Sequence, residues 1–252
     1  MAVRWPFLDH PGPLAFAHRG GAGDWPENTM PAFENAVTLG YRYLETDVHT
    51  TADGVLVAFH DDRLDRVTDR TGLIGALPWS EVRRARVGGE PIPLLEDLLG
   101  TWPDVRVNID PKHDAAVDPL VAVIERTGAH DRVCVAAFSD ARLARFRRLT
   151  ADRVCTGSGP HEIARLRIAA YGVPTGRVAA ACVQVPVRHG RVLLVDRRFL
   201  AAAHRRKLPV HVWTIDDPVE MDRLLDLGVD GIMTDRPAVL KEVLERRRQW
   251  AA

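Results

Sequence analysis

The sequence predicts an α/β protein that folds as a (β/α)8 barrel of the TIM type. Short apolar runs rich in β-branched residues alternate along the chain with longer segments of helical periodicity, which is typical of parallel βα units. The chain has 252 residues, about the size of one such barrel. A doubly wound parallel sheet produces the same alternation, so the alternation by itself leaves that fold open as well.

The strand candidates are one more than a barrel requires. In chain order they are 14–18, 43–48, 55–60, 105–110, 133–138, 153–157, 181–186, 210–215 and 230–234. Counted in this way, eight segments would form the barrel and the remaining one would be added to it as part of a hairpin.

Helical segments lie between most of these strands. In the first of them, Phe33, Ala36 and Val37 recur at helical spacing, and Asn28 or Thr29 can cap its start. The predicted helices are 29–39, 79–86, 94–99, 117–127, 139–149, 160–170, 197–206, 217–227 and 236–248.

One junction breaks the alternation. Segments 43–48 and 55–60 are joined by a linker that is too short for a crossover helix and contains Asp53-Gly54. Asp-Gly between two alternating runs is a strong hairpin signal, so a β-hairpin is predicted after the second strand. The segment 61–93, rich in Asp, Arg, Gly and Pro, is predicted as a short irregular insertion that is too small for a separate domain.

The hairpin also predicts a register. If Asp and Gly are the two central residues of a tight turn, His60 lies directly opposite Asp47, and Ala58 lies opposite His49. A slip of one residue would then turn His60 to the other face of the hairpin.

Composition and charge exclude several classes of partner. Lys+Arg and Asp+Glu each number 34, so the formal net charge is +0 and no global field would recruit nucleic acid or an anionic membrane. No stretch approaches 18 apolar residues and the N-terminus lacks a continuous apolar segment, so we expect no integral membrane segment and no signal peptide. We therefore expect a cytoplasmic protein with one domain over 1–252. Its oligomeric state is left open.

The cysteines do not form a recognisable motif. Cys134, Cys155 and Cys182 are far apart in the sequence and lie in apolar, strand-like runs. Because they lack the spacing of a metal motif, they are interpreted as buried, reduced thiols.

Carboxylates collect at the predicted strand ends, where the active groups of parallel barrels lie. Glu45 and Asp47 are two residues apart and share one face of their strand, and Asp110 ends the strand 105–110. Each carboxylate alone is more often a solvated or salt-bridged residue. Three of them within apolar runs instead predict a hard divalent cation, Mg2+ or Ca2+ with Mn2+ as a further candidate, whereas zinc would usually recruit His or Cys.

Histidines and cations accompany these carboxylates. His18 and His60 lie at strand ends on either side of the cluster, which suits a general acid and a general base near neutral pH. A lone histidine would more often be a core or surface residue. Arg19 and Lys112 are candidates for contacts to an anionic phosphoryl group, and a salt bridge to the same carboxylates is the alternative for Lys112.

These residues carry a resemblance to a known family. The chain resembles the glycerophosphodiester phosphodiesterases, which fold as a (β/α)8 barrel, and the resemblance runs in family order from residue 14 to the C-terminus. The matching segments are AHRGGAGDWPENTMPAF (17–33), LETDVHTTADGVLVAFHDDRLDRVT (44–68), PLLEDLL (93–99), VNIDPKH (107–113), VHVWTIDD (210–217) and VDGIMTDRP (229–237).

The resemblance implies hydrolysis of glycerophosphodiesters to an alcohol and sn-glycerol 3-phosphate. Position by position, it implies Glu45, Asp47 and Asp110 as metal ligands, His18 and His60 as the acid–base pair, Arg19 and Lys112 as phosphate contacts, and Trp213 as a residue lining the pocket. The motif at 27–29 is interpreted mainly as capping and support of the site. The family often has Glu where this chain has Asp110, so the third ligand has a shorter reach here.

Alternatives remain at this point. A lysophospholipase D-type activity of the same family would differ in the alcohol part of the substrate. A non-catalytic, anion-binding barrel would be expected to have lost a catalytic position, and none is lost. A metal-dependent amidohydrolase would need several histidine ligands on one metal, whereas the predicted strand ends offer carboxylates. The nucleophile, water or the substrate's own 2-hydroxyl, and the identity of the basic histidine are left open.

Overall fold

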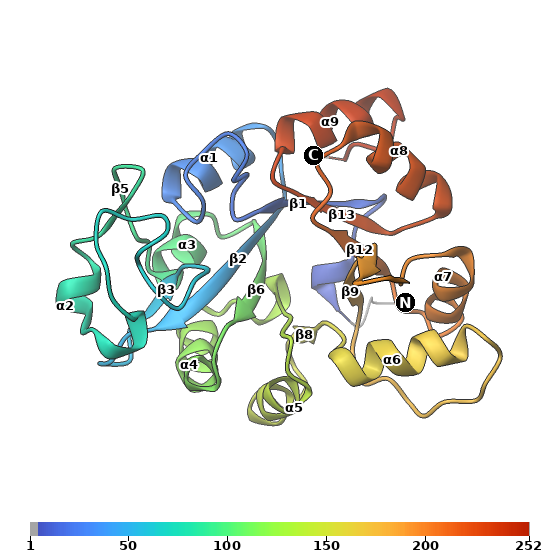
Figure 1. Cartoon of the computed structure of the whole chain (residues 1–252), viewed down its shortest axis with the longest axis horizontal. Helices are drawn as coiled ribbons and strands as arrows, with labels where there is room; N and C mark the ends of the chain where they lie inside the picture. The colour runs from blue at the N-terminus through green and yellow to red at the C-terminus, as the bar shows by residue number, and fades with distance from the viewer. Residues whose placement is uncertain (1–4, 252) are drawn as a thin grey trace.

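The computed structural model describes residues 5–251, which form a barrel of parallel strands surrounded by helices (Figure 1). The eight parallel strands in this range are β1 (Leu14–His18), β2 (Tyr43–Thr50), β6 (Arg106–Pro111), β7 (Val133–Val135), β8 (Cys155–Thr156), β9 (Val183–Pro186), β12 (Val210–Trp213) and β13 (Gly231–Thr234). The helices that follow them in turn are α1 (Met30–Thr38), α3 (Leu95–Thr101), α4 (Val117–Thr127), α5 (Asp140–Leu149), α6 (Pro160–Ala169), α7 (Arg197–His204), α8 (Pro218–Leu227) and α9 (Pro237–Arg246). The predicted (β/α)8 class is confirmed.

The sheet closes on itself. Its strand order is β8-β7-β6-β2-β1-β13-β12-β9, and every neighbouring pair in this order is parallel. The two ends of the order meet through the parallel bridge between Gly157 and Cys182, where the amide of Ala181 also donates to the carbonyl of Thr156 at 2.9 Å. This closure decides between the two folds that the alternation left open, because a doubly wound sheet has free edges.

Two cores lie on opposite faces of the barrel wall. Leu44 and Val107 point outward and pack with residues of the surrounding helices. Phe16, Tyr43 and Met233, from three different strands, instead form an inner cluster. Phe7, from the 3-10 turn Pro6–Leu8, belongs to this inner cluster, and its carbonyl accepts a hydrogen bond from the Tyr43 hydroxyl at 2.9 Å. The lower interior of the barrel is therefore filled with side chains, and polar groups are left to its upper end.

Most observed elements agree with the predicted segments and are shorter at their ends, whereas β2 and α3 each end two residues later than predicted. Segment 133–138 is a strand only over β7, because Ala136, Ala137 and Phe138 leave the sheet and line a pocket at its edge. The predicted helix 79–86 is too long. Helix α2 (Trp79–Val82) stops early, since the chain turns into the small hairpin of β4 (Arg86–Val87) and β5 (Glu90–Pro91).

The hairpin after the second strand is present, but its predicted register is wrong by one residue. Strand β3 (Leu56–Ala58) runs antiparallel to β2, with Val48 opposite Ala58 and His49 opposite Val57. The amide of Gly54 donates to the Thr51 carbonyl at 3.0 Å, and the amide of Thr51 donates to the Val55 carbonyl at 2.9 Å.

The reason for the shifted register is the length of the loop. Residues 52–54 form a three-residue loop in place of the predicted two-residue turn, and Gly54 adopts a φ of +87° at its last position. Asp47 consequently accepts from the amide of Phe59, with 2.9 Å between its carbonyl oxygen and that nitrogen, and the predicted 47–60 pairing is absent. His60 still reaches the site because it lies beyond the end of β3, where the alternation of the strand no longer applies.

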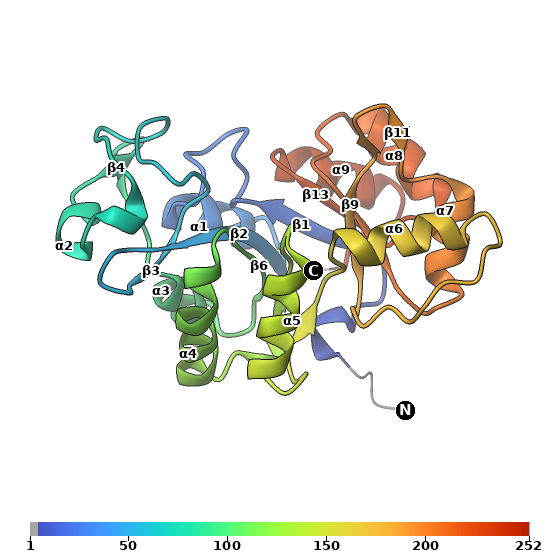
Figure 2. The ribbon, with the colours of Figure 1, turned by 60° about the horizontal axis from the view of Figure 1, so that its bottom comes forward.

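The insertion 61–93 projects from one side of the barrel (Figure 2). Leu64, Ile74 and Val82 of the insertion form a small apolar cluster together with Val57 and Phe59 of the hairpin return. Among residues 5–251 there is no helix with the length and apolar character that a membrane crossing requires.

Candidate active site

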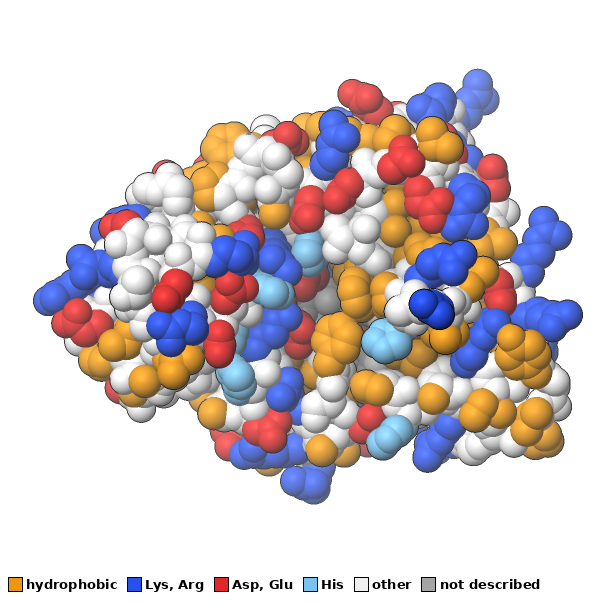
Figure 3. All heavy atoms as spheres, in the orientation of Figure 1, with side chains coloured by type: hydrophobic (Ala, Val, Ile, Leu, Met, Phe, Trp, Pro, Cys, Tyr) orange, Lys and Arg blue, Asp and Glu red, His pale blue; other side chains and the backbone are white. Residues whose placement is uncertain are grey.

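A pocket of about 280 Å³ lies where the carboxyl ends of the strands meet. All the side chains predicted for the site line it: His18, Arg19, Glu45, Asp47, His60, Asp110, Lys112 and Trp213. Figure 3 shows a hollow near the middle of this face, in which acidic, basic and histidine side chains gather beside a hydrophobic border. The convergence predicted from the strand ends is therefore observed, while the role of each residue stays a prediction.

The three carboxylates lie on adjacent strands and are nearly inaccessible. Glu45, Asp47 and Asp110 are 5%, 2% and 8% exposed, and Asp47 pairs directly with Asp110 in the β2–β6 register. Burial, reinforced by the charge of Asp47, raises the pKa of Glu45 to about 7. Burial also raises the pKa of Asp110, and Lys112 only partly offsets it. The site thus concentrates negative charge where water cannot solvate it.

Lys112 lies between two of these carboxylates. Its Nζ is 2.6 Å from Asp47 Oδ1 and 2.8 Å from Asp110 Oδ2. Burial would raise the pKa of Asp47, but Lys112 and Arg19 outweigh burial and lower it. The salt bridge that the sequence left open for Lys112 is present. An ammonium group has three donors, so one of them remains for a further acceptor.

Arg19 follows β1 in a turn with a φ of +51°. Its amide donates to Glu45 Oε2 at 3.1 Å, its Nε lies 3.2 Å from Asp47 Oδ2, and its Nη1 donates to Glu27 Oε1 at 3.1 Å. Both the backbone and the guanidinium of this residue therefore help to orient the carboxylates.

His18 lies at the end of β1 between two acidic groups. Its Nδ1 is 2.6 Å from Asp235 Oδ1, and its Nε2 is 3.7 Å from Glu45 Oε2. Burial lowers the pKa of His18, but Glu45 and Asp235 outweigh burial, so the net shift is upward. Because Asp235 engages Nδ1, the other ring nitrogen faces the carboxylate cluster.

His60 is also held by a carboxylate through Nδ1. Its Nδ1 is 2.6 Å from Asp61 Oδ1, and Asp61 is held in turn by Arg66, whose Nε donates to Oδ2 at 2.6 Å. Hydrogen bonds from Arg66 and then His60 lower the pKa of Asp61. Arg66 also donates to Glu27 Oε1 at 2.7 Å, so this residue of the insertion shares the Glu27 carboxylate with Arg19.

Several residues of the site had no role assigned from the sequence. Asp235 and Asp61 orient the histidines. The sequence signal for Asp235 is an acidic residue directly after a strand end, and that for Asp61 is an acidic residue directly after the histidine.

The motif at 27–29 contacts the carboxylate cluster. Asn28 places Nδ2 3.5 Å from Asp47 Oδ2, and its Oδ1 accepts from Thr46 Oγ1 at 2.7 Å, which agrees with the predicted supporting role of this motif. Thr29 is the observed N-cap of α1.

The other wall of the pocket is apolar. Trp213 and Phe138 meet edge to face with their ring centroids 5.6 Å apart, and Ile163 and Met233 also line the cavity. Phe138 is 69% exposed. A ligand with one charged and one less polar part would match this division of the pocket.

The residues present fit a hard cation. Asp110 Oδ1 is buried and has no hydrogen-bond partner among residues 5–251, which is unusual for a carboxylate oxygen. Glu45, Asp47 and Asp110 offer only oxygen ligands, the set that Mg2+, Ca2+ and Mn2+ prefer. Such a set contains neither a thiolate nor an imidazole.

Comparisons with known proteins agree with this geometry. The model of the glycerophosphoryl diester phosphodiesterase family matches residues 18–239. A probable glycerophosphodiester phosphodiesterase 2 of Mycobacterium tuberculosis is 43% identical over 254 residues, covering 97% of this chain and 95% of the relative. A glycerophosphodiester phosphodiesterase of Bacillus altitudinis is 31% identical over 239 residues, covering 88% and 94%.

Solved structures share the fold. A putative glycerophosphoryl diester phosphodiesterase from Silicibacter pomeroyi superposes with a TM-score of 0.83 at 24% identity, covering 98% of this chain and 100% of that one. A phosphodiesterase from Oleispira antarctica, solved in complex with the product sn-glycerol-3-phosphate, has a TM-score of 0.79 at 22% identity and covers 92% and 97%. The predicted enzyme class, a phosphoric diester hydrolase, is confirmed, and the chain belongs to the glycerophosphoryl diester phosphodiesterase family.

Proposed function

We propose that this enzyme hydrolyses glycerophosphodiesters to an alcohol and sn-glycerol 3-phosphate, with one divalent cation and a histidine pair, in a single barrel domain. The observation that carries the proposal is that His18 and His60 line the same pocket as a buried carboxylate cluster. The glycerol 3-phosphate product of the Oleispira antarctica enzyme supports the choice of substrate class.

Glu45, Asp47 and Asp110 would hold the cation, which is Mg2+, Ca2+ or Mn2+. When bound, it supplies charge to a non-bridging phosphate oxygen and acidifies a coordinated hydroxyl. Its positive charge would offset the negative charge that burial concentrates on these three side chains.

The substrate's remaining phosphate charge would be met by Arg19 and Lys112. Lys112 has a third donor beyond its contacts with Asp47 and Asp110, and Arg19 has donors beyond those that hold Glu27 and Asp47. Both groups are positioned by carboxylates before substrate arrives, so little reorganisation is required on binding.

The histidines would move the protons. One imidazole removes the proton of the attacking hydroxyl, from water or from the 2-hydroxyl of the substrate glycerol, and the other donates a proton to the leaving alkoxide. Asp235 and Asp61 hold the Nδ1 atoms of His18 and His60, so each Nε2 is the atom that exchanges protons with substrate.

The apolar wall favours a second candidate within the same chemistry. Phe138, Trp213 and Ile163 could accept the acyl part of a lysophospholipid, which would make the enzyme a lysophospholipase D-type phosphodiesterase. A lysophospholipase D GDPD1 from Rattus norvegicus is 25% identical over 266 residues and covers 90% of this chain.

Product analysis separates these candidates. The purified enzyme is incubated with glycerophosphocholine, glycerophosphoethanolamine or lysophosphatidylcholine, with and without EDTA. Release of choline or ethanolamine together with glycerol 3-phosphate from the first two substrates, abolished by EDTA and restored by Mg2+, Ca2+ or Mn2+, supports the main proposal. Turnover of lysophosphatidylcholine alone assigns the second function, and undiminished turnover after exhaustive chelation contradicts the role of the cation.

A further inference from the structure

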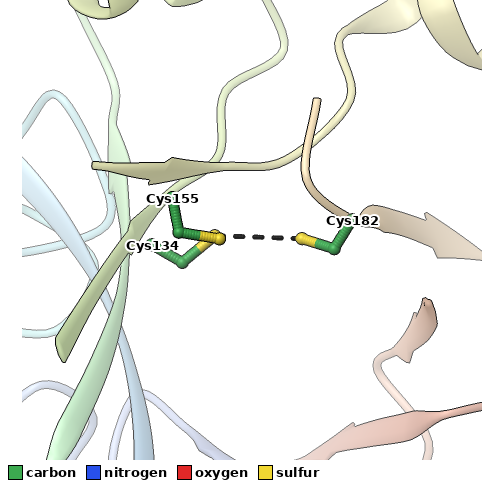
Figure 4. Close-up of side chains that lie close together, drawn as sticks. All are labelled: Cys134, Cys155 and Cys182. Carbon is green, nitrogen blue, oxygen red and sulfur yellow. Dashed lines mark hydrogen bonds between the residues drawn. The ribbon is translucent and has the colours of Figure 1, made fainter. Parts of the chain in front are cut away.

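Three cysteines that are distant in the sequence meet inside the barrel. Cys134 lies on β7, Cys155 on β8, and Cys182 immediately before β9, and their sulfur atoms all lie within 4.8 Å of one another (Figure 4). All three are free and buried, as the sequence predicts. The spacing of the cysteines in the sequence does not predict this cluster, because Cys134 and Cys155 become neighbours only through the pairing of the parallel strands β7 and β8.

The sulfur spacing suits a common ligand better than a disulfide. Cys134 Sγ and Cys182 Sγ are 3.9 Å apart, well beyond the ~2.05 Å of a sulfur–sulfur bond. In a tetrahedral thiolate site, zinc–sulfur bonds of about 2.3 Å place two sulfurs about 3.8 Å apart. The observed separation therefore needs little change to become one edge of such a site.

A nitrogen donor lies beside the sulfurs. His211 on β12 is 0% exposed and its imidazole acts on the Cys182 thiol, but its ring nitrogens do not lie within 4.8 Å of all three sulfurs. Coordination by His211 would therefore require a shift of the imidazole toward the cluster. Its Nε2 is buried and has no hydrogen-bond partner in the described part of the chain, which is rare for a core imidazole. Its Nδ1 lies 3.4 Å from Gln184 Nε2, which also donates to Asn108 Oδ1 at 2.8 Å. Coordination through His211 Nε2 therefore requires the Gln184 and Asn108 amides to turn over together, so that the Gln184 oxygen accepts the Nδ1 proton.

Donor type selects the ion. Thiolates and imidazole favour zinc and other soft or borderline cations, whereas the carboxylates at the mouth of the barrel favour hard cations. The two sites would therefore not compete for the same metal. We propose that Cys134, Cys155 and Cys182, with His211 as the fourth donor, form a structural Zn2+ site inside the barrel.

The position of the cluster indicates what the ion would do. Strand β8 has two residues, and within residues 5–251 the barrel closes between β8 and β9 through the bridge of Gly157 with Cys182. A zinc ion bound to the four side chains would cross-link β7, β8, β9 and β12 across this weakly paired seam. Binding transfers the three thiol protons to solvent, and the complex of three thiolates, one neutral imidazole and Zn2+ carries one negative charge.

The test uses the full chain and cobalt as a spectroscopic substitute for zinc. The reduced protein is refolded with Co2+ in the presence of excess Mg2+, which occupies the oxygen ligands. Sulfur-to-cobalt charge-transfer absorption in the near ultraviolet arises only from thiolate ligands, so it reports on this site alone. We expect one cobalt per chain with this absorption, and its loss on addition of one equivalent of Zn2+.

Variants assign the ligands. Cys182→Ala should lose the charge-transfer absorption, whereas Met233→Leu, a change of a neighbouring sulfur residue in the same inner cluster, should keep it. His211→Gln should keep the charge-transfer bands and alter the visible d–d bands of cobalt. An unaltered visible spectrum would contradict the role of His211.

A second measurement does not depend on the folding of variants. Wild-type protein expressed in zinc-supplemented medium is treated with EDTA, dialysed and analysed for metal by mass spectrometry. About one zinc per chain that is released only when the thiols are titrated with an organomercurial supports the proposal. Reduced protein without thiolate-bound metal in both experiments, a disulfide between these cysteines, or tight binding of another metal in place of zinc overturns it.

Discussion

At the scale of single residues, the site combines groups that are chemically alike but held differently. His18 and His60 each bind a carboxylate through Nδ1, but the partner of His18 follows the last strand of the barrel, whereas Asp61 directly follows His60 in the chain. Two histidines with the same local geometry in one pocket can serve as the general acid and the general base of phosphodiester cleavage.

The histidines give the first prediction. Proton transfer by a positioned side chain is worth about 10²–10⁴-fold, so His18→Ala and His60→Ala should each lower kcat by at least the smaller factor. His189→Ala, a change of an exposed histidine on β10 (Arg188–His189), is the matched control and should leave kcat unchanged. A variant of His18 or His60 that keeps wild-type turnover would remove that residue from the mechanism.

Lys112 gives the second prediction. If its third donor meets the substrate phosphate in the ground state and in the transition state, Lys112→Ala should raise KM about tenfold or more. The loss of a hydrogen bond to a charged group corresponds to about 1.5–3 kcal/mol. Steady-state kinetics on glycerophosphocholine measure this effect, with Lys207→Ala as the control. If KM is unchanged, Lys112 serves only as the bridge between Asp47 and Asp110.

At the scale of elements, the convergence of the site residues could be predicted from the parallel strands, whereas the register of the hairpin could not. Glu45, Asp47 and Asp110 could be expected to converge because parallel strands end at one edge. The loop length depends instead on Asp53, whose Oδ1 accepts from Thr51 Oγ1 at 2.6 Å and from the Trp79 amide at 2.9 Å. Trp79 belongs to the insertion, so a tertiary contact helps to select the loop.

The third prediction concerns this loop. Gly54→Ala should lower the free energy of unfolding by about 1 kcal/mol, because φ is +87° and a Cβ is unfavourable there although it would meet no atom within 4 Å. Gly100→Ala in α3 should raise it by about 0.5–1 kcal/mol through helix propensity, again without a close contact. Urea unfolding measures both, and equal effects of the two substitutions would contradict the assigned conformation of Gly54.

Contacts between residues that are distant in the sequence also could not be predicted from local patterns. Cys134 and Cys182 are 48 positions apart, and their meeting requires closure of the barrel. Asp235 could be recognised as a residue at a strand end, but its partner His18 is 217 positions away. Local patterns predict elements and the faces of strands, whereas such pairings are decided by which strands become neighbours when the sheet closes.

At the scale of the whole molecule, the barrel contains a polar upper layer whose charge opposes folding. Burial and the neighbouring charge of Asp47 raise the pKa of Glu45, and Lys112 and Arg19 offset this shift only in part, although the same two cations hold the pKa of Asp47 below its usual value. The buried charges of the site lower the stability of the folded protein, which is a common cost of an active site.

The fourth prediction measures this cost. In EDTA, Glu45→Gln should unfold at a higher temperature than the wild type, because it removes one of the buried like charges. With Mg2+ or Ca2+ at about a hundredfold excess over Kd, the wild type should gain about 5–10 °C in Tm and the variant clearly less. Thermal unfolding followed by circular dichroism provides the test. A cation effect of equal size in both proteins would show that Glu45 is not a ligand.

Arg66 has a consequence for engineering. It belongs to the insertion, yet its guanidinium joins Asp61, the partner of His60, to Glu27, the partner of Arg19. The insertion is therefore not an independent module that can be exchanged freely between relatives to change their specificity. A chimera that imports a foreign segment at 61–93 would have to transplant the Glu27–Asp61–Arg66 trio as one unit, or the graft would disturb the partners of both His60 and Arg19.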